Sequence, residues 1–308
     1  MISRVASPLP NPLPAIPGEG TRSLPQDFHE TDHRPARVSS GVRAIPHVAV
    51  GLFLLTAAHS RAANVTVDLV PSVTAVEPGG KLTVAAVFKI EKGWHLYWIN
   101  PGETGSPPEL KWTTPAGLTV GSPQFPTPKT INANGLTAYG YERSLVVLYD
   151  VTVPKDASGE IELKANADWV VCSNLCVAEQ QAVSVKVPVA AERGSANEPQ
   201  KFDQWRARQP KRVDSPVIAT IDADGKHGSL DMKVSPGSTF AEFFPPLADF
   251  AEWEKPTVDG DTVRARFRVF PNPPATHVAD AITVTKDQSG PQAVIQQVQF
   301  RFQSSRKE

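Results

Sequence analysis

The chain has 308 residues, of which 30 are proline, and its formal net charge at pH 7 is −1. The length suggests about two domains. Because the charges nearly cancel, no broad attraction to nucleic acid or to an anionic membrane is expected. Abundant proline and few helix-favouring runs indicate strands, turns and linkers rather than a helical protein.

The first 62 residues are expected to precede the folded protein. Residues 1–43 are rich in proline, arginine and polar side chains without an apolar period, which predicts disorder. An apolar run from Ala44 to Ala58 follows, and it ends near Ser60-Arg61-Ala62, a small-x-small cleavage signal. Its core is too short to span a bilayer, so the pattern predicts a secretory signal peptide.

Export to the periplasm follows from that signal, with a mature chain that starts near Ala63. A translation start near Val42 would leave a signal peptide of ordinary length. No later segment approaches the roughly 18 consecutive apolar residues of a membrane helix, so we expect no transmembrane segment in the mature chain. An exported protein lies in a compartment where disulfides persist.

From residue 63 to 190, short runs alternate between apolar and polar side chains and are separated by turns such as Glu77-Pro-Gly-Gly80. Such alternation predicts strands with one buried face. Strands and turns at this spacing indicate an antiparallel β-sandwich. In one strand we expect three side chains in the core and two facing outwards: Trp94, Leu96 and Trp98 inside, His95 and Tyr97 outside.

A polar stretch over residues 191–215 is expected to be a linker with a short helix near 202–208. From 216 to 308 the alternation returns and predicts a second sandwich, without cysteines. Within it, the aromatic-rich stretch Thr239–Trp253 looks more like a helical or irregular cover than a strand. The predicted fold class is therefore all-β, with two antiparallel β-sandwich domains in tandem.

Three arginines alternate with apolar residues in the second domain: Arg264, Arg266 and Arg268. They could form a basic binding face. Because strict alternation is typical of a sheet with one face in water, we expect a solvated sheet face instead.

The only two cysteines, Cys172 and Cys176, stand at the end of an alternating run whose buried face includes Trp169 and Val171. Cys172 falls on the opposite face, in line with Asp168. Fully extended, the two Cα atoms would lie ~13–14 Å apart, whereas a disulfide needs roughly 4.4–6.8 Å. A bond therefore requires a helical turn or a tight loop after Val171.

Spacing alone leaves two roles open for such a bond. Closing a loop of about five residues stabilises a fold by only about 2 kcal/mol in the chain-entropy model, against ~4.7 kcal/mol for a loop of about a hundred. A weak brace of this kind favours a redox switch. The alternative is a local clip that holds a loop and takes no part in chemistry.

Three blocks of sequence together resemble one known family. They are Gly93–Gly105 (GWHLYWINPGETG), Tyr139–Glu142 (YGYE) and Ala167–Cys176 (ADWVVCSNLC). In this order and at about these distances, they look like the N-terminal periplasmic domain of the DsbD/ScsB class of thiol:disulfide interchange proteins. The resemblance covers most of residues 64–190. The second domain, with Phe243-Phe-Pro245, is more loosely similar to the additional domain of ScsB-type members.

The resemblance implies an immunoglobulin-like domain whose cysteine pair relays reducing equivalents by thiol–disulfide exchange. The implied partners are thioredoxin-like periplasmic proteins or a membrane-embedded electron donor. In relatives the second cysteine engages the partner, so Cys176 is the expected nucleophile and Cys172 the resolving thiol. Members usually continue into a transmembrane electron-carrying domain and a thioredoxin-like domain. This sequence has neither, so we expect them to be encoded separately or this copy to serve another use.

Relatives also shield the pair with a cap loop that carries an aromatic residue. In this sequence Tyr139, Tyr141 and Glu142 are the expected neighbours of the pair, with Trp169 beneath it. The alternative for the two tyrosines is that they are core and surface members of one strand.

Asp168 and Glu179 flank the cysteines. Close to the sulfurs, their charge would raise the thiol pKa, but we favour ordinary solvated carboxylates. His95 is expected to be an exposed strand residue rather than a group that tunes a thiol or binds a metal. With two thiols and scattered histidines we expect no metal site and no cofactor, although Cu(I) on two thiolates is conceivable.

The sequence therefore predicts a periplasmic thiol–disulfide exchange protein whose activity depends on partner proteins. The alternative is a non-enzymatic interaction module or a copper-binding module with a structural disulfide. We find no Ser–His–Asp arrangement, phosphate loop or nucleotide fingerprint in the sequence, so catalysis other than sulfur exchange has no visible basis.

Overall fold

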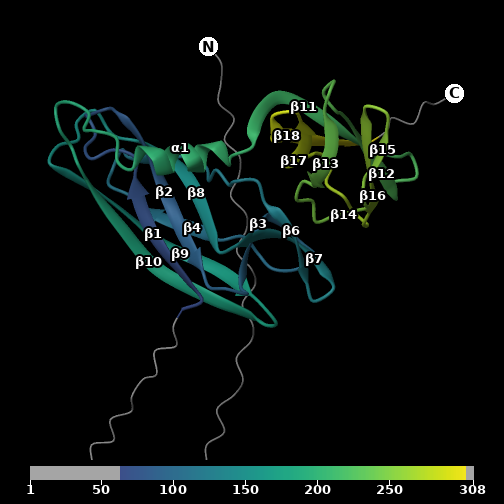
Figure 1. Cartoon of the computed structure of the whole chain (residues 1–308), viewed down its shortest axis with the longest axis horizontal. Helices are drawn as coiled ribbons and strands as arrows, with labels where there is room; N and C mark the ends of the chain where they lie inside the picture. The colour runs from purple at the N-terminus through teal and green to yellow at the C-terminus, as the bar shows by residue number, and fades with distance from the viewer. Residues whose placement is uncertain (1–62, 303–308) are drawn as a thin grey trace, which may run out of the picture. The chain divides into compact units, whose positions relative to one another are not determined.

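The computed structural model describes residues 63–302, and the leader and signal peptide expected over residues 1–62 lie outside this part. The described chain consists of the strands β1 to β18 and the helix α1 (Figure 1). None of the helical structure in residues 63–302 is long and apolar enough to cross a membrane.

The first domain contains two sheets. One has the strand order β1-β2-β8-β5, and its strands are β1 (Val65–Pro71), β2 (Lys81–Ile90), β8 (Ser144–Thr152) and β5 (Thr119–Val120). The other has the order β10-β9-β3-β7-β6, with β4 (Glu109–Thr113) paired to β9. Its strands are β10 (Cys176–Pro188), β9 (Glu160–Cys172), β3 (His95–Gly102), β7 (Leu136–Glu142) and β6 (Lys129–Ala133).

The core of the first domain lies between these sheets, because every second residue of the strands is apolar. Strand β9 shows the pattern most clearly, since its buried and less buried residues alternate along most of its length. Each named strand pair of this domain is antiparallel. Both faces of the core contribute large side chains, among them Phe88, Leu145, Trp98, Leu96 and Trp169.

The helix α1 (Pro199–Ala207) belongs to the stretch expected as a linker, and it packs on the first domain. Proline at its first turn suits a helix start, where its missing N–H has no partner in any case. Phe202 is buried against three residues on the outer face of β2 and β8: Ala85, Val146 and Leu148. Much of the expected linker is therefore ordered, and the next strand already begins at Lys211.

The second domain has the strand order β13-β17-β18-β11-β12-β16-β14. These strands are β13 (Thr239–Phe244), β17 (His277–Asp287), β18 (Gly290–Phe302), β11 (Lys211–Ile221), β12 (His227–Lys233), β16 (Thr262–Val269) and β14 (Ala251–Trp253). The short strand β15 (Thr257–Asp259) pairs with β16. The order corresponds to strands C-F-G, then A-B-E-D, of an immunoglobulin domain.

Strand β11 joins the two halves of this sandwich. It runs antiparallel to β12 and parallel to β18, with an irregularity between Val213 and Val217. The parallel pair was not foreseen, because the sequence was expected to form antiparallel sheets only. The core takes side chains from both halves, including Phe243 and Phe300 from one and Leu230 and Phe267 from the other. The predicted all-β fold with two sandwiches is thus confirmed.

Two smaller expectations for the second domain have different outcomes. The stretch Thr239–Trp253 is not a helical cover, because it contains the strands β13 and β14; its dense aromatic residues obscured their alternation. The arginines of β16 do lie on a solvated face, as expected. Arg264 pairs with Asp231, and Arg268 pairs with Glu252.

If α1 is an integral part of the first domain, truncating Phe202 should destabilise that domain. Phe202→Ala removes a fully buried ring and should lower the free energy of unfolding by about 3–5 kcal/mol. Gln204→Ala, at an exposed position of the same helix, should change it by less than about 0.5 kcal/mol. Urea unfolding followed by tryptophan fluorescence measures both. Equal effects of the two variants would mean that the helix is not docked in solution.

Candidate functional site

The cysteine pair closes the hairpin formed by β9 and β10. Cys172 is the last residue of β9 and Cys176 the first of β10, and the two stand directly opposite each other. Their Cα atoms are 4.1 Å apart and their sulfurs form a disulfide. The loop between them is held by Ser173 N–H, which donates to the carbonyl of Leu175 over 2.9 Å. This is the tight loop after Val171 that the spacing required.

The two cysteines differ in their exposure. Cys172 is 2% exposed, whereas Cys176 is exposed. Leu175, beside Cys176, is 53% exposed, which is unusual for a large apolar side chain. An incoming protein thiol can therefore approach Cys176 far more easily than Cys172.

Cys172 lies on the face of its sheet that is turned away from the sandwich core. Its side chain belongs to a small cluster with Tyr97 and Ala138, both 0% exposed. Ile131 and Ala133, from the hairpin of β6 and β7, pack against the same cluster. The buried sulfur thus sits in an apolar pocket that neighbouring strands of its own sheet provide.

His95 stands beside this cluster, on β3, directly opposite Cys172 on β9. Its Nε2 atom lies 3.2 Å from the hydroxyl of Tyr97 in a buried hydrogen bond. Side chains directly opposite each other across antiparallel strands have Cβ atoms roughly 4.5–5.5 Å apart and share one face. The structure therefore places an imidazole next to the buried cysteine.

The prediction that His95 and Tyr97 face solvent is wrong, since they are 6% and 0% exposed. They do point away from the sandwich core, as alternation required, but that second face is covered too. The loop after β3 covers it at Gly105, where a methyl group would meet the Tyr97 ring at 2.2 Å. Gly105 has φ +88°, a conformation that glycine adopts easily. The Tyr97 hydroxyl lies inside this cover, where its hydrogen-bond partner is His95.

Burial sets the protonation of this cluster. Loss of water around His95 lowers its pKa below the usual value of 6.5, and the negative charge of Glu142 offsets part of that effect. Burial raises the pKa of Tyr97 above 10. At neutral pH the cluster therefore contains a neutral imidazole and a neutral phenol, both able to donate or accept a hydrogen bond.

The three residues expected to cap the pair are placed differently from one another. Tyr141 is a core residue whose hydroxyl donates to the carbonyl of Pro126 over 2.7 Å. Tyr139 packs edge-on against Phe244, with ring centroids 5.5 Å apart. Glu142 is opposite His95 across β3 and β7, and it is the one of the three that the structure connects to the cysteine cluster.

The residues that flank the cysteines along the hairpin are engaged in contacts of their own. Trp169 lies in the core, and its Nε1–H donates to Glu179 over 3.1 Å. Glu179 also accepts hydrogen bonds from the backbone of Asn64 and Val65, so the expectation that it is an ordinary solvated carboxylate is wrong. Asp168 forms an ion pair with Lys111 at 3.0 Å. Neither carboxylate is free to act on the sulfurs.

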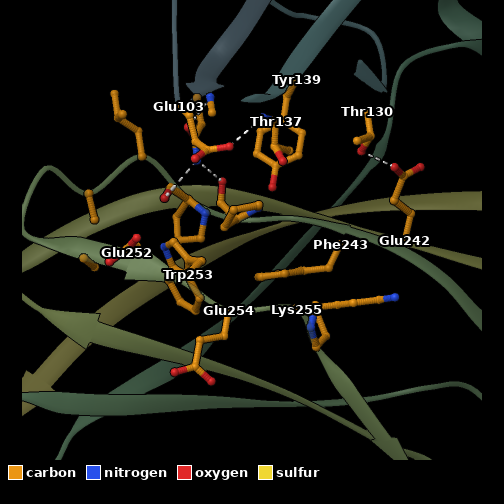
Figure 2. A pocket seen from close by; sticks show the side chains of 18 of the residues that line it. Glu103, Thr130, Thr137, Tyr139, Glu242, Phe243, Glu252, Trp253, Glu254 and Lys255 are labelled. Atoms are coloured by element: carbon orange, nitrogen blue, oxygen red, sulfur yellow. Dashed lines mark hydrogen bonds between the residues drawn. The ribbon is translucent and has the colours of Figure 1, made fainter. Parts of the chain in front are cut away.

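A separate cavity of about 880 Å³ lies elsewhere and contains neither cysteine in its lining. Figure 2 shows Glu103, Glu242 and Glu252 among its polar side chains, and Phe243 and Trp253 among its aromatic ones. Thr130 donates a hydrogen bond to Glu242, as the dashed line in Figure 2 marks. Because these carboxylates already have partners in the protein, the cavity is a weaker candidate than the disulfide.

Within residues 63–302 the structure has no group of three or more histidine, cysteine, aspartate or glutamate side chains that could hold a metal ion. The arrangement around the cysteines itself favours sulfur chemistry, because the two sulfurs are joined in a disulfide. Its parts are an exposed sulfur, a buried sulfur and a neutral imidazole beside the buried one.

Residues 66–188 match the family model for the N-terminal region of the thiol:disulfide interchange protein DsbD. These residues include both cysteines, His95 and all strands of the first domain apart from the first residue of β1. This part of the chain is therefore a domain of the DsbD/ScsB class, as the sequence predicted. No curated protein sequence matches the chain significantly.

Among solved structures, the N-terminal periplasmic domain of ScsB from Proteus mirabilis matches 76% of this chain and 91% of its own length. The TM-score is 0.52 and the identity 18%, so the match shows the fold alone. The major pilin subunit of Bacillus cereus (TM-score 0.27, 9% identity, covering 79% of this chain and 68% of that one) is too dissimilar to support any argument. The same holds for an endo-fucoidan hydrolase of glycoside hydrolase family 107, which has a TM-score of 0.21 and 11% identity and covers 75% of this chain and 32% of its own.

The lowered pKa of His95 predicts a pH-dependent stability. Because the pKa of His95 is lower in the folded than in the unfolded state, the unfolded state binds more protons at mildly acidic pH. The free energy of unfolding should therefore fall as the pH drops below about 6.5, and it should level off below the pKa of His95 in the folded state. The difference in unfolding free energy between wild type and His95→Gln should therefore shrink between about pH 7 and 5. Urea unfolding at several pH values measures it. Tyr97→Phe, which keeps the imidazole, should retain the wild-type slope; parallel profiles for wild type and His95→Gln would contradict the prediction.

Proposed function

We propose that this protein carries out thiol–disulfide exchange in the periplasm, relaying reducing equivalents between partner proteins through Cys172 and Cys176. The observation that carries the proposal is the asymmetric disulfide of a DsbD/ScsB-class domain. One of its cysteines is exposed at a hairpin tip, and the other is buried behind it. A structural brace would gain nothing from presenting one cysteine to solvent beside an exposed leucine.

The reaction has two steps. A partner thiolate attacks Sγ of Cys176, the intramolecular S–S bond breaks, and the electron pair of that bond leaves on Cys172 as a thiolate. The second partner thiol then attacks the partner's own sulfur in the mixed disulfide and releases Cys176. The partner leaves oxidised and this protein is left with two thiols. The same steps in reverse reduce an oxidised partner, with Cys176 as nucleophile and Cys172 as resolving thiol.

The exposure of each cysteine supports this division of roles. Attack on a disulfide needs access to the sulfur that is attacked, and Cys176 is the exposed residue of the pair. Cys172, at 2% exposure, can reach its neighbour across the hairpin but is screened from a partner protein. The resolving sulfur is thereby protected from attack by other thiols.

The surface around the pair suits a protein partner. Leu175, in the cysteine loop, is 53% exposed. A large apolar side chain exposed beside a reactive sulfur favours docking of a folded partner over reaction with small thiols alone. Thioredoxin-like proteins or a membrane-embedded electron donor are the partners that the family membership supports.

Trapping tests the two roles. Cys172→Ser leaves Cys176 without its resolving thiol, so a mixed disulfide with a partner should accumulate and be reversed by dithiothreitol. Cys176→Ser, the matched variant with only the buried thiol, should trap little. Non-reducing electrophoresis and mass spectrometry of periplasmic extracts measure both. Trapping by Cys176→Ser alone would reverse the assignment.

The redox equilibrium separates a relay from a passive clip. A relay requires a reduction potential above about −300 mV, whereas structural disulfides of secreted proteins lie below it. Reduction should also cost the fold only about 2 kcal/mol, since the loop is short. Equilibration with glutathione or a thioredoxin-like protein gives the potential. A pair that resists glutathione, in a protein whose Cys→Ser variants keep all partner binding, would support the clip.

A further inference from the structure

The burial of Cys172 creates a chemical difficulty that the exposed Cys176 does not have. In the exchange, Cys172 must either leave as a thiolate or attack as one. A thiolate in an apolar pocket is unfavourable, because burial penalises the charged form and raises the thiol pKa. Cys172 shares its cluster with Tyr97 and Ala138, at 0% exposure, so water cannot readily supply or remove its proton.

Few titratable groups face this sulfur in the described part of the chain. From β3 come His95, opposite Cys172, and Tyr97 in the same cluster. From β7 comes Glu142, opposite His95 and exposed. Asp168, on β9 itself, is held by Lys111. Because burial raises the pKa of Tyr97, its phenol stays protonated at neutral pH and can neither take up the thiol proton nor readily give up its own. The imidazole is left as the group suited to exchange a proton at neutral pH.

The position of His95 is fixed from two sides. Its backbone is bridged to that of Cys172, which brings the two side chains to one face of the sheet. The Tyr97 hydroxyl, 3.2 Å from Nε2, holds the ring in one orientation. The tyrosine is in turn held in place by the loop after β3, which Gly105 allows to lie directly on its ring. A buried ring held in this way keeps one nitrogen engaged and the other available.

We propose that His95 exchanges a proton with the buried sulfur of Cys172 and that Tyr97 is the positioning residue for its imidazole. When a partner thiolate opens the disulfide at Cys176, the imidazole takes up a proton from solvent and passes it to the Cys172 thiolate, which returns the ring to its neutral form. When Cys172 resolves a mixed disulfide, the neutral imidazole accepts the thiol proton as the new S–S bond forms. The partner thiolate then leaves with the electron pair of the bond that breaks. This inference rests on the proposed function.

Stopped-flow reaction of the reduced, full mature chain with excess 5,5′-dithiobis(2-nitrobenzoate) separates the two sulfurs. Attack by Cys176 on the reagent releases the first coloured thiolate at a rate that rises with reagent concentration. Attack by Cys172 on the resulting mixed disulfide releases the second at a rate independent of it. The inference concerns the second phase only.

His95→Gln should slow the second phase by at least about tenfold at pH 7, as expected for a thiol pKa raised by about one unit or more. Its pH profile should move to higher pH, while the first phase stays unchanged. His227→Gln, an exposed histidine of the second domain, serves as the matched control and should leave both phases as in wild type. An unchanged second phase in folded His95→Gln would overturn the inference.

Two further results keep the test decisive. If His95→Gln does not fold, Tyr97→Phe replaces it in the test. Because this variant lacks the hydrogen bond from the tyrosine hydroxyl to His95, the second phase should slow and its pH profile should shift. An unchanged second phase in Tyr97→Phe would overturn the inference. Absorbance of the Cys172 thiolate near 240 nm in Cys176→Ser should show the same shift when His95→Gln is added. Failure of the proposed function looks different, because the wild-type protein would then exchange no disulfide with a thioredoxin-like protein even with both phases intact.

Discussion

The covering of the second face of the β10-β9-β3-β7-β6 sheet is the constraint on which the site depends. A sandwich needs only one buried face per sheet, and the other usually meets water. Here Tyr97, His95 and Cys172 lie on that other face and are nonetheless buried. The loop through Gly105 and the hairpin of β6 and β7 exclude water from them. Without this cover, both cysteines would be exposed and chemically alike.

The cover converts a simple hairpin disulfide into a directional one. In the proposed exchange a partner meets a single sulfur, because Cys172 is buried and Cys176 exposed, and the other sulfur is reserved for the intramolecular step. The same burial that protects Cys172 raises the cost of its thiolate, so protection and reactivity are in conflict. A neutral imidazole beside the sulfur lets Cys172 stay buried and still exchange its proton. The wide separation in sequence between His95 and Cys172 is bridged by the pairing of β3 with β9.

The two carboxylates beside the cysteines illustrate how local contacts exclude alternative roles. Glu179 ties the start of β1 to Trp169, and Asp168 holds Lys111, so each has a structural use. Their charges are therefore largely satisfied at a distance from the sulfurs. The large cavity of Figure 2 is similar in this respect, since its carboxylates have partners within the protein.

The sequence by itself determined the strands, the tight loop between the cysteines and the class of the first domain. Those features depend on near neighbours, namely the alternation of apolar residues, the turn residues and the spacing of Cys172 and Cys176. The strands of Thr239–Trp253 were missed because aromatic residues occupy both faces there. Alternation also placed His95 correctly on the far side of its strand. Only the tertiary structure decided that this side is buried, because the strand that bears Cys172 and the hairpin of β6 and β7 come from other parts of the chain. A periodic pattern in one strand carries no information about what packs on that strand.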